Sequence, residues 1–136
     1  MEIEIQITSQ PIGGKTSLPS AGAGAHAEFS GIVRGEENGH AIAALEYEAY
    51  SPMAERTMRE IITEIGSRHS CLSVLVIHRI GIIPVGETAI YVSAAARHRA
   101  EAFAMLMEFM NRLKQDVPIW KRRAFSSDEL AALKKS

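Results

Sequence analysis

Hydrophobic and polar residues alternate strictly at the start of the chain. From Glu2 to Ile7, isoleucines take every second position, and acidic or amide side chains lie between them. A period of two predicts a strand with one buried face. The segment 9–24 that follows is rich in Gly, Pro and Ser, so we expect a loop there, with room for one short helical turn.

Four further segments have the composition of strands. Residues 25–34 and 41–47 are apolar-rich and flank a turn signal at Asn38-Gly39, which predicts a hairpin of two adjacent antiparallel strands. Residues 72–79 and 88–95 are β-branched or apolar runs on either side of a connection bounded by glycines. They predict a second pair of strands.

Two segments instead show the 3.6-residue period of amphipathic helices. In the first, apolar residues recur at helical spacing between Ala54 and Ile65. Ser51 is the expected N-cap, because a serine side chain can accept from a free amide of the first turn. Pro52 is the expected first helical residue, and Gly66 is placed to end the helix.

The second helical segment runs from Arg97 to Lys114. It has to end by Val117, because Pro118 lacks an amide proton and disfavours helical geometry at the residue before it. The residues around the proline are therefore expected to be extended. The terminal stretch 126–135 begins with serines suited to an N-cap, which predicts a short third helix.

The order of these main elements is three strands, a helix, two strands and a helix. It predicts an α+β fold with a largely antiparallel sheet covered by two main helices. A chain of 136 residues has the size of one domain with one hydrophobic core. We therefore expect a single domain over residues 1–136.

Composition is that of an ordinary globular domain. Apolar residues make up 46% and charged residues 23%, which argues against disorder, collagen-like repeats and coiled coil. The first residues lack the basic and apolar regions of a secretory signal, and no apolar run approaches the roughly 18 residues of a membrane span. The single cysteine, Cys71, cannot form an internal disulfide. We therefore expect a cytoplasmic protein with no membrane association.

Charge is unevenly distributed, although the net charge is only −1. From Arg97 onwards there are nine Lys or Arg and five Asp or Glu, against six and eleven before it. In this basic part His98 and Arg99 begin the second helix, Lys114 ends it and Lys121 follows the proline. The residues alone leave two interpretations open, a shared anion site or separate charges in solvent.

Other candidate sites have weaker support. Gly22-Ala-Gly-Ala-His-Ala27 has the spacing of a dinucleotide-binding loop, but that loop needs a strand before it and a helix after it, and neither is expected here. Cys71 has no adjacent base and is expected to be a packed thiol. The five histidines lack metal-ligand spacing, so we expect no metal site.

Six blocks, in order along the chain, resemble the large, catalytic subunit of molybdopterin synthase. They extend from about Ala25 to Lys121, and the H-R-x-x-A-F block from His98 and the K-x-x-x-P-I-W-K block from Lys114 are the most specific. The blocks read Phe29-Ser-Gly-Ile-Val-Arg34, Leu45-Glu-Tyr-Glu-Ala-Tyr50 with Met53-Ala-Glu55, Ile77-His-Arg-Ile-Gly81, Val85-Gly-Glu87, Arg97-His-Arg-Ala-Glu-Ala-Phe103 and Lys114-Gln-Asp-Val-Pro-Ile-Trp-Lys121.

The resemblance implies a cytoplasmic sulfurtransferase of molybdenum cofactor biosynthesis. Members of this family convert cyclic pyranopterin monophosphate into molybdopterin by installing its two dithiolene sulfurs. The sulfur arrives as a thiocarboxylate on the C-terminal Gly-Gly tail of a small ubiquitin-like subunit, which threads into a pocket of the large subunit. The implied fold is an α/β hammerhead, and the implied assembly is a heterotetramer, a homodimer flanked by two small subunits. No cofactor is implied.

The resemblance also implies roles for individual residues. Substrate phosphate and thiocarboxylate are both anions, and guanidinium groups bind phosphate with two hydrogen bonds. The expected substrate-binding residues are Arg34, His98 and Arg99, with Phe29 and Met110 as apolar walls that exclude water. The expected catalytic residues are Lys121, as principal catalyst, and Lys114, as its partner in binding and charge stabilisation.

After Lys121 the chain departs from the family. The family usually continues with an acidic residue, a glycine and a tryptophan, whereas Arg122-Arg-Ala-Phe125 follows here and Trp120 is the only tryptophan. This departure motivates an alternative, a non-catalytic paralogue that keeps the fold and the groove for the small subunit. A third interpretation, a nucleic-acid patch at 121–123 and 134–135, is disfavoured by the net charge and by the lack of a stacking platform.

Overall fold

The computed structural model describes residues 1–13 and 21–135. The predicted loop over 9–24 lies partly outside the described residues, at 14–20, and its described parts contain neither helix nor strand. The elements, in chain order, are β1 (Glu2–Thr8), β2 (Ala25–Ile32), β3 (Glu36–Glu37), β4 (His40–Ala41), β5 (Ala44–Ala49), α1 (Met53–His69), β6 (Cys71–Arg79), β7 (Gly81–Pro84), β8 (Thr88–Ala96), α2 (Arg99–Asp116), β9 (Ile119–Phe125) and α3 (Ser127–Lys134).

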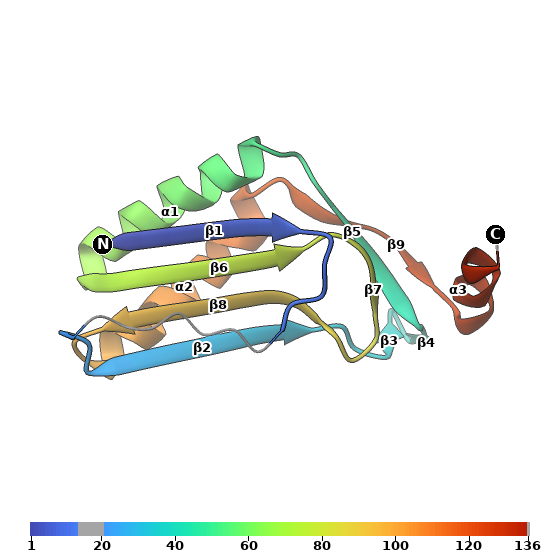
Figure 1. Cartoon of the computed structure of the whole chain (residues 1–136), viewed down its shortest axis with the longest axis horizontal. Helices are drawn as coiled ribbons and strands as arrows, with labels where there is room; N and C mark the ends of the chain where they lie inside the picture. The colour runs from blue at the N-terminus through green and yellow to red at the C-terminus, as the bar shows by residue number, and fades with distance from the viewer. Residues whose placement is uncertain (14–20, 136) are drawn as a thin grey trace.

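Four strands form the main sheet, in the order β1, β6, β8, β2 (Figure 1). β1 and β6 run parallel, and the other two neighbouring pairs run antiparallel. α1 and α2 lie side by side across one face of this sheet. The prediction of an α+β fold with a largely antiparallel sheet and two covering helices is confirmed. None of the helices in the described residues is long and apolar enough to cross a membrane.

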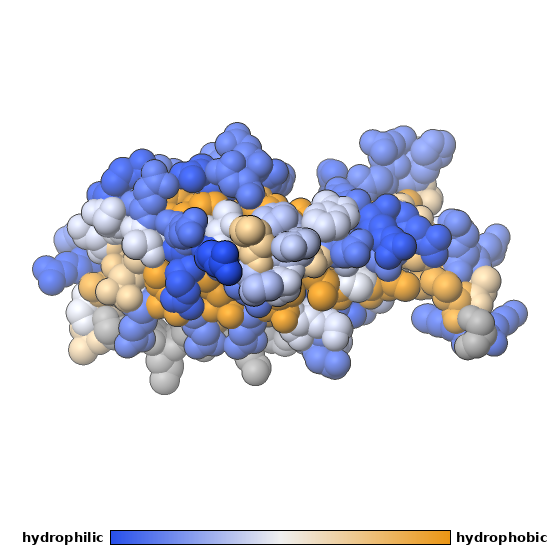
Figure 2. All heavy atoms as spheres, turned by 90° about the horizontal axis from the view of Figure 1, so that it is seen from above, coloured by the Kyte–Doolittle hydropathy of each residue, from blue (hydrophilic) through white to orange (hydrophobic). Residues whose placement is uncertain are grey.

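The hydrophobic core fills the space between the main sheet and the two helices. Alternate residues of β6, Val74 and Val76, belong to this core, as the period of two in a strand requires. The helices contribute the fully buried side chains of Met58, Ile62 and Phe109. Seen from above, hydrophobic residues form a band between hydrophilic outer surfaces (Figure 2). This layer stabilises the fold, since each such side chain contributes roughly 1.5–3 kcal/mol when buried.

A smaller sheet, in the order β7, β5, β9, lies beyond the carboxyl end of α2 (Figure 1). β5 pairs antiparallel with both neighbours. The register between β5 and β9 shifts, so that Arg123 lies opposite Glu46 while Lys121 lies opposite Tyr47. A bulge of this kind changes the direction of the side chains beyond it. α3 lies at the far end of β9 and extends away from the main sheet.

The hairpin predicted from residues 25–34 and 41–47 is wrong in its strand partners. β2 pairs with β8, and β5 pairs with β7 and β9 in a different sheet. Only the turn itself forms: Asn38 and Gly39 have φ angles of 52° and 80° and join the two-residue strands β3 and β4. A turn signal determines local backbone geometry, whereas the partners of a strand depend on segments far along the chain.

Both predicted ends of the first helix are also corrected. Its N-cap is Pro52 rather than Ser51, and the helix continues past Gly66 to His69, where the left-handed C-cap Ser70, with φ 53°, follows. Gly66 is buried, and a Cβ at this position would collide with the side chain of Met1. The glycine therefore leaves room for the Met1 side chain, just before β1, and does not end the helix.

The remaining element predictions are confirmed. β6 and β8 pair antiparallel, although the connection between them contains the short strand β7, which the sequence pattern did not predict. α2 ends before Val117, which is extended. α3 begins after Ser126, whose hydroxyl accepts from the amide of Glu129 at 3.1 Å while the Glu129 carboxylate accepts from the amide of Ser126 at 2.9 Å. This reciprocal pair is a capping box.

Candidate functional site

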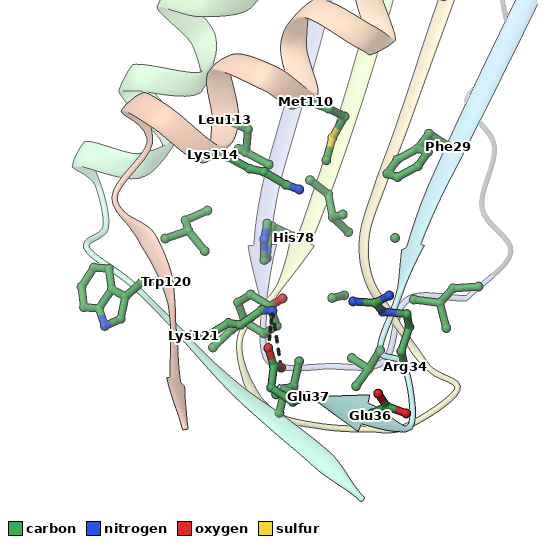
Figure 3. Close-up of a pocket in the computed structure, with 18 residues that line it drawn as sticks. Phe29, Arg34, Glu36, Glu37, His78, Met110, Leu113, Lys114, Trp120 and Lys121 are labelled. Carbon is green, nitrogen blue, oxygen red and sulfur yellow. Dashed lines mark hydrogen bonds and ion pairs between the residues drawn. The ribbon is translucent and has the colours of Figure 1, made fainter. Parts of the chain in front are cut away.

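A cavity opens where the main sheet, the carboxyl end of α2 and β9 meet (Figure 3). Its volume is about 460 Å³, which is in the usual range for small-molecule sites. The elements of the core continue into it: His78 follows Val76 by two residues on β6, and Met110 and Lys114 lie in the last turns of α2. The cavity is therefore built on the rigid elements that also form the core.

Three cations from three parts of the chain line this cavity. Arg34 follows β2, Lys114 lies in the last turn of α2, and Lys121 lies on β9. Figure 3 shows the three side chains directed toward the cavity from its rim. Cations gathered in this way attract phosphate and carboxylate groups and can bind them through charge-assisted hydrogen bonds.

Two acidic residues, Glu36 and Glu37, lie on the same rim. The Nζ atom of Lys121 is 3.2 Å from Oε1 of Glu37 (Figure 3). The Lys121 side chain is 50% exposed and that of Glu37 is 27% exposed, so solvent screens the pair and it contributes only about 0–1 kcal/mol. An anionic ligand can therefore replace the Glu37 carboxylate beside Lys121 at little cost.

Apolar side chains form the other part of the wall. Phe29 from β2 and Met110 from α2 lie near each other in the same part of the cavity wall (Figure 3). Leu113 is buried between the cavity and the core. Phe29 and Trp120 are 40% and 44% exposed, so the cavity is open at its mouth. A ligand bound here would have an apolar wall on one side and cations on the other.

His78 and Tyr47 form the most buried polar part of the cavity. Their rings meet edge to face, with centroids 5.5 Å apart. His78 Nδ1 donates a hydrogen bond of 2.8 Å to the backbone carbonyl of Arg79. Burial lowers the pKa of His78, and this hydrogen bond only partly opposes the shift, so the ring is neutral at pH 7. Burial raises the pKa of Tyr47, which keeps its hydroxyl protonated.

The structure brings five of the seven predicted site residues to this cavity. They are Phe29, Arg34, Met110, Lys114 and Lys121. His98 and Arg99 are instead at the opposite end of α2, where His98 is the N-cap and both side chains are exposed. At 1.5 Å per residue, Arg99 lies about 22 Å along the helix axis from Lys114. Within one chain these two residues do not reach the cavity.

Sequence reasoning missed Glu37, Tyr47 and His78. The sequence pattern could have indicated His78, because it follows Val74 and Val76 at every second position of the predicted strand and so belongs to the same face. A histidine on a buried face is a polar group that needs a hydrogen-bond partner. Glu37 gave no such signal, since it lies in a polar turn. Its position beside Lys121 on β9 is a tertiary contact, between residues 84 positions apart in the chain.

The weaker candidates take on structural roles. Cys71 is buried, and burial raises the pKa of its thiol, which makes it a poor nucleophile. In the described residues, no three His, Cys, Asp or Glu side chains gather as metal ligands. Arg122 and Arg123 lie 3.9 Å and 3.7 Å from carboxylates of β5, so the basic run of β9 is partly neutralised within the protein.

Sequence comparison identifies the family. The profile of the family described as MoaE protein matches residues 6–116. The chain is 38% identical over 108 residues to the molybdopterin synthase catalytic subunit of Oryza sativa subsp. indica, which covers 79% of the chain and 56% of that relative. It is 35% identical over 127 residues to the Bacillus subtilis (strain 168) protein of the same name, covering 91% of the chain and 81% of the relative. The chain belongs to the MoaE family.

Structural comparison agrees with this assignment. A solved structure described as molybdopterin synthase from Staphylococcus aureus superposes with a TM-score of 0.81 at 31% identity, over 90% of this chain and 91% of the other. The chain spans only about half the length of the rice relative. The match to the family profile ends before Pro118, so Lys121 lies beyond it.

Proposed function

We propose that this chain is the catalytic subunit of a molybdopterin synthase. In this proposal it is a sulfurtransferase that moves sulfur from the thiocarboxylated C-terminal Gly-Gly of a small ubiquitin-like subunit to cyclic pyranopterin monophosphate, forming the dithiolene of molybdopterin. Membership of the MoaE family supports this function. The observation that carries it is a cavity in which Arg34, Lys114 and Lys121 converge opposite an apolar wall.

The substrate and the sulfur donor both suit this cavity. Each carries a negative charge, and the cavity offers a guanidinium and two ammonium groups from three different elements. Arg34 is the group best suited to the phosphate, because a guanidinium can donate two parallel hydrogen bonds. Trp120 and Phe29 of the cavity lining are partly exposed, so an extended tail would enter from the solvent side of these residues.

Lys121 is the proposed principal catalyst, acting as an acid, a base or an amine nucleophile at the acyl carbon of the sulfur donor. Its Nζ is held at 3.2 Å from a displaceable carboxylate and is exposed to the cavity. Lys114 is its proposed partner, which binds the anion and stabilises charge. Phe29 and Met110 would keep water from the sulfur-bearing intermediate.

The proposed assembly is a homodimer within a heterotetramer, in the cytoplasm. His98 and Arg99 are too far along α2 to serve the cavity of their own chain. A role for them in substrate binding therefore requires the cavity of a second copy, which a homodimer would supply. Binding of the small subunit is proposed for the same face as the cavity mouth.

The alternative is a non-catalytic paralogue that binds the small subunit but does not turn over. One observation favours it: the C-terminal segment forms α3, which extends away from the main sheet and contributes no residue to the cavity. The described part of the chain therefore does not close the cavity with its own C-terminus. Retention of both lysines in the cavity favours the enzyme.

The test is an assay of this chain with a thiocarboxylated small subunit and cyclic pyranopterin monophosphate, in which molybdopterin is detected as its fluorescent oxidation product. Molybdopterin formation is expected. Binding of the small subunit without any product would instead identify the paralogue.

A further inference from the structure

His78 is a polar group of the cavity that the proposed chemistry does not use. His78 lies at the carboxyl end of β6, on the face that Val74 and Val76 turn toward the core, and its side chain is 4% exposed. A buried histidine is normally satisfied on both ring nitrogens. In His78 only Nδ1 has a hydrogen-bond partner within the described residues.

The tautomer of His78 is fixed by the backbone. Nδ1 donates to the carbonyl of Arg79 at 2.8 Å, so Nδ1 carries the proton and Nε2 of the neutral ring is an acceptor. In the described residues Nε2 has no hydrogen-bond partner, and unlike Nε2 of His26 it is not sealed from solvent. Since His78 lines the cavity, this lone pair is available to a ligand there.

The neighbouring side chains make this acceptor distinctive. Lys and Arg side chains can only donate, and the carboxylate acceptors of the cavity, Glu36 and Glu37, lie on its solvent-exposed rim, whereas His78 is buried. The charged or titratable side chains that share the cavity with His78 are Tyr47 from β5, Lys114 from α2, Lys121 from β9, Arg34 after β2, and Glu36 and Glu37 from β3. The adjacent Arg79 pairs with Glu87 at 2.6 Å and is not a cavity residue.

We propose that His78 is a specificity-determining residue, whose Nε2 accepts a hydrogen bond from an N–H group of the pterin ring while the cations at the rim hold the phosphate. This inference rests on the proposed function, because it takes cyclic pyranopterin monophosphate as the ligand. The phosphate has no N–H to offer, whereas a pterin ring has several. His78 would thus select for the ring, and the cations for the charge.

A consequence is a defined pH dependence of binding. When His78 is protonated, Nε2 becomes a donor and the hydrogen bond is lost. Affinity should be constant from pH 8 down to the pKa of His78, which burial places below its ordinary value, and should then fall about tenfold per pH unit. A cyclic phosphodiester does not titrate in this range, and among the described cavity side chains His78 is the one whose ordinary pKa lies closest to neutrality.

The experiment measures the dissociation constant for cyclic pyranopterin monophosphate from pH 8 to pH 5 with the full chain and three variants. His78→Leu should weaken binding at pH 8 by about tenfold to a hundredfold, because the ring N–H is left unpaired, and should remove the acid-side fall. His78→Gln should bind within a few-fold of the unsubstituted chain, because its amide oxygen can accept, and should also lack the fall. His40→Gln is the matched control, because His40 is an exposed histidine on β4. This variant should keep both the affinity at pH 8 and the loss of affinity at acid pH.

Equal affinity of His78→Leu and the unsubstituted chain, or the same acid-side fall in both, would overturn the inference while leaving the proposed function intact. If His78→Leu does not fold, the pH profiles of the unsubstituted chain and of His78→Gln still decide the matter. Absence of any binding by the unsubstituted chain would instead remove the proposed function, and this inference with it.

Discussion

The middle and the carboxyl end of α2 show how one helix serves two different purposes. Toward its middle, Phe109 and Met105 are completely buried between the helix and the main sheet, and no polar group is needed there. In its last two turns, Met110 and Lys114 line the cavity instead. The same helical period that places apolar residues in the core thus brings chemically active residues to a site held rigidly by that core. Substitutions in the core should therefore lower the stability of the protein, whereas substitutions in the cavity should lower its activity.

The largest effect is expected in the core. Phe109→Ala removes a completely buried ring and should lower the free energy of unfolding by about 3–5 kcal/mol, measured by urea denaturation. Phe103→Ala makes the same change on the same helix, where the ring is 62% exposed, and should change it by less than about 0.5 kcal/mol. Similar losses of stability for the two variants would contradict the placement of Phe109 in the hydrophobic core and of Phe103 on the surface.

In the cavity the loss should be of activity and not of stability. Lys121→Ala should reduce molybdopterin formation by at least about a hundredfold, since general acid–base or nucleophilic catalysis contributes this much or more. Its side chain is half exposed, so the free energy of unfolding should change by less than about 0.5 kcal/mol. Arg122→Ala, the next residue on β9, is the control because Arg122 does not line the cavity. A Lys121→Ala variant with normal turnover would contradict the assignment of this lysine.

Destabilising the C-terminal helix α3 should affect neither the stability of the core nor the activity of the cavity. Ser126→Ala removes one half of the capping box and should destabilise α3 locally by about 1 kcal/mol, seen as faster amide hydrogen exchange in residues 127–134. No residue of α3 is buried, so the free energy of global unfolding should not change. A large drop in molybdopterin formation would show that α3 takes part in the site.

The smallest effect concerns the ion pair at the rim. Glu37→Gln removes the carboxylate that competes with an anionic ligand for Lys121. Because an exposed pair contributes about 0.2–1 kcal/mol, affinity for cyclic pyranopterin monophosphate should rise by no more than about fivefold. Weaker binding by this variant would mean that Glu37 holds Lys121 in its active position and does not compete with the ligand.

The sequence predicted the helices and the strands far better than the partners of the strands. The apolar-rich composition of residues 25–34 and 41–47 predicted the strands β2 and β5, yet composition carries no information about which distant strand completes a sheet, and a local turn at Asn38-Gly39 suggested the wrong pair. Gly66 was misread for a related reason, since only the tertiary structure shows that Met1 packs against it.

The site was predicted in part. Lys114 and Lys121 lie on either side of Pro118 in the chain, yet the residues alone left open whether they share a site, and the resemblance to a family placed them in one pocket. Arg34 comes from a segment 80 residues earlier than Lys114, and only the resemblance to a family linked it to them. His98 and Arg99 are adjacent to Ala100 and the rest of α2 in sequence, but a straight helix keeps them at the other end from the cavity.

The most direct test of the account is the position of the substrate. A crystal structure of the chain with cyclic pyranopterin monophosphate should show the phosphate in the cavity, within hydrogen-bond distance of Arg34 and at least one of Lys114 and Lys121. A phosphate bound at the N-terminus of α2 beside His98 and Arg99, with the cavity empty, would contradict it.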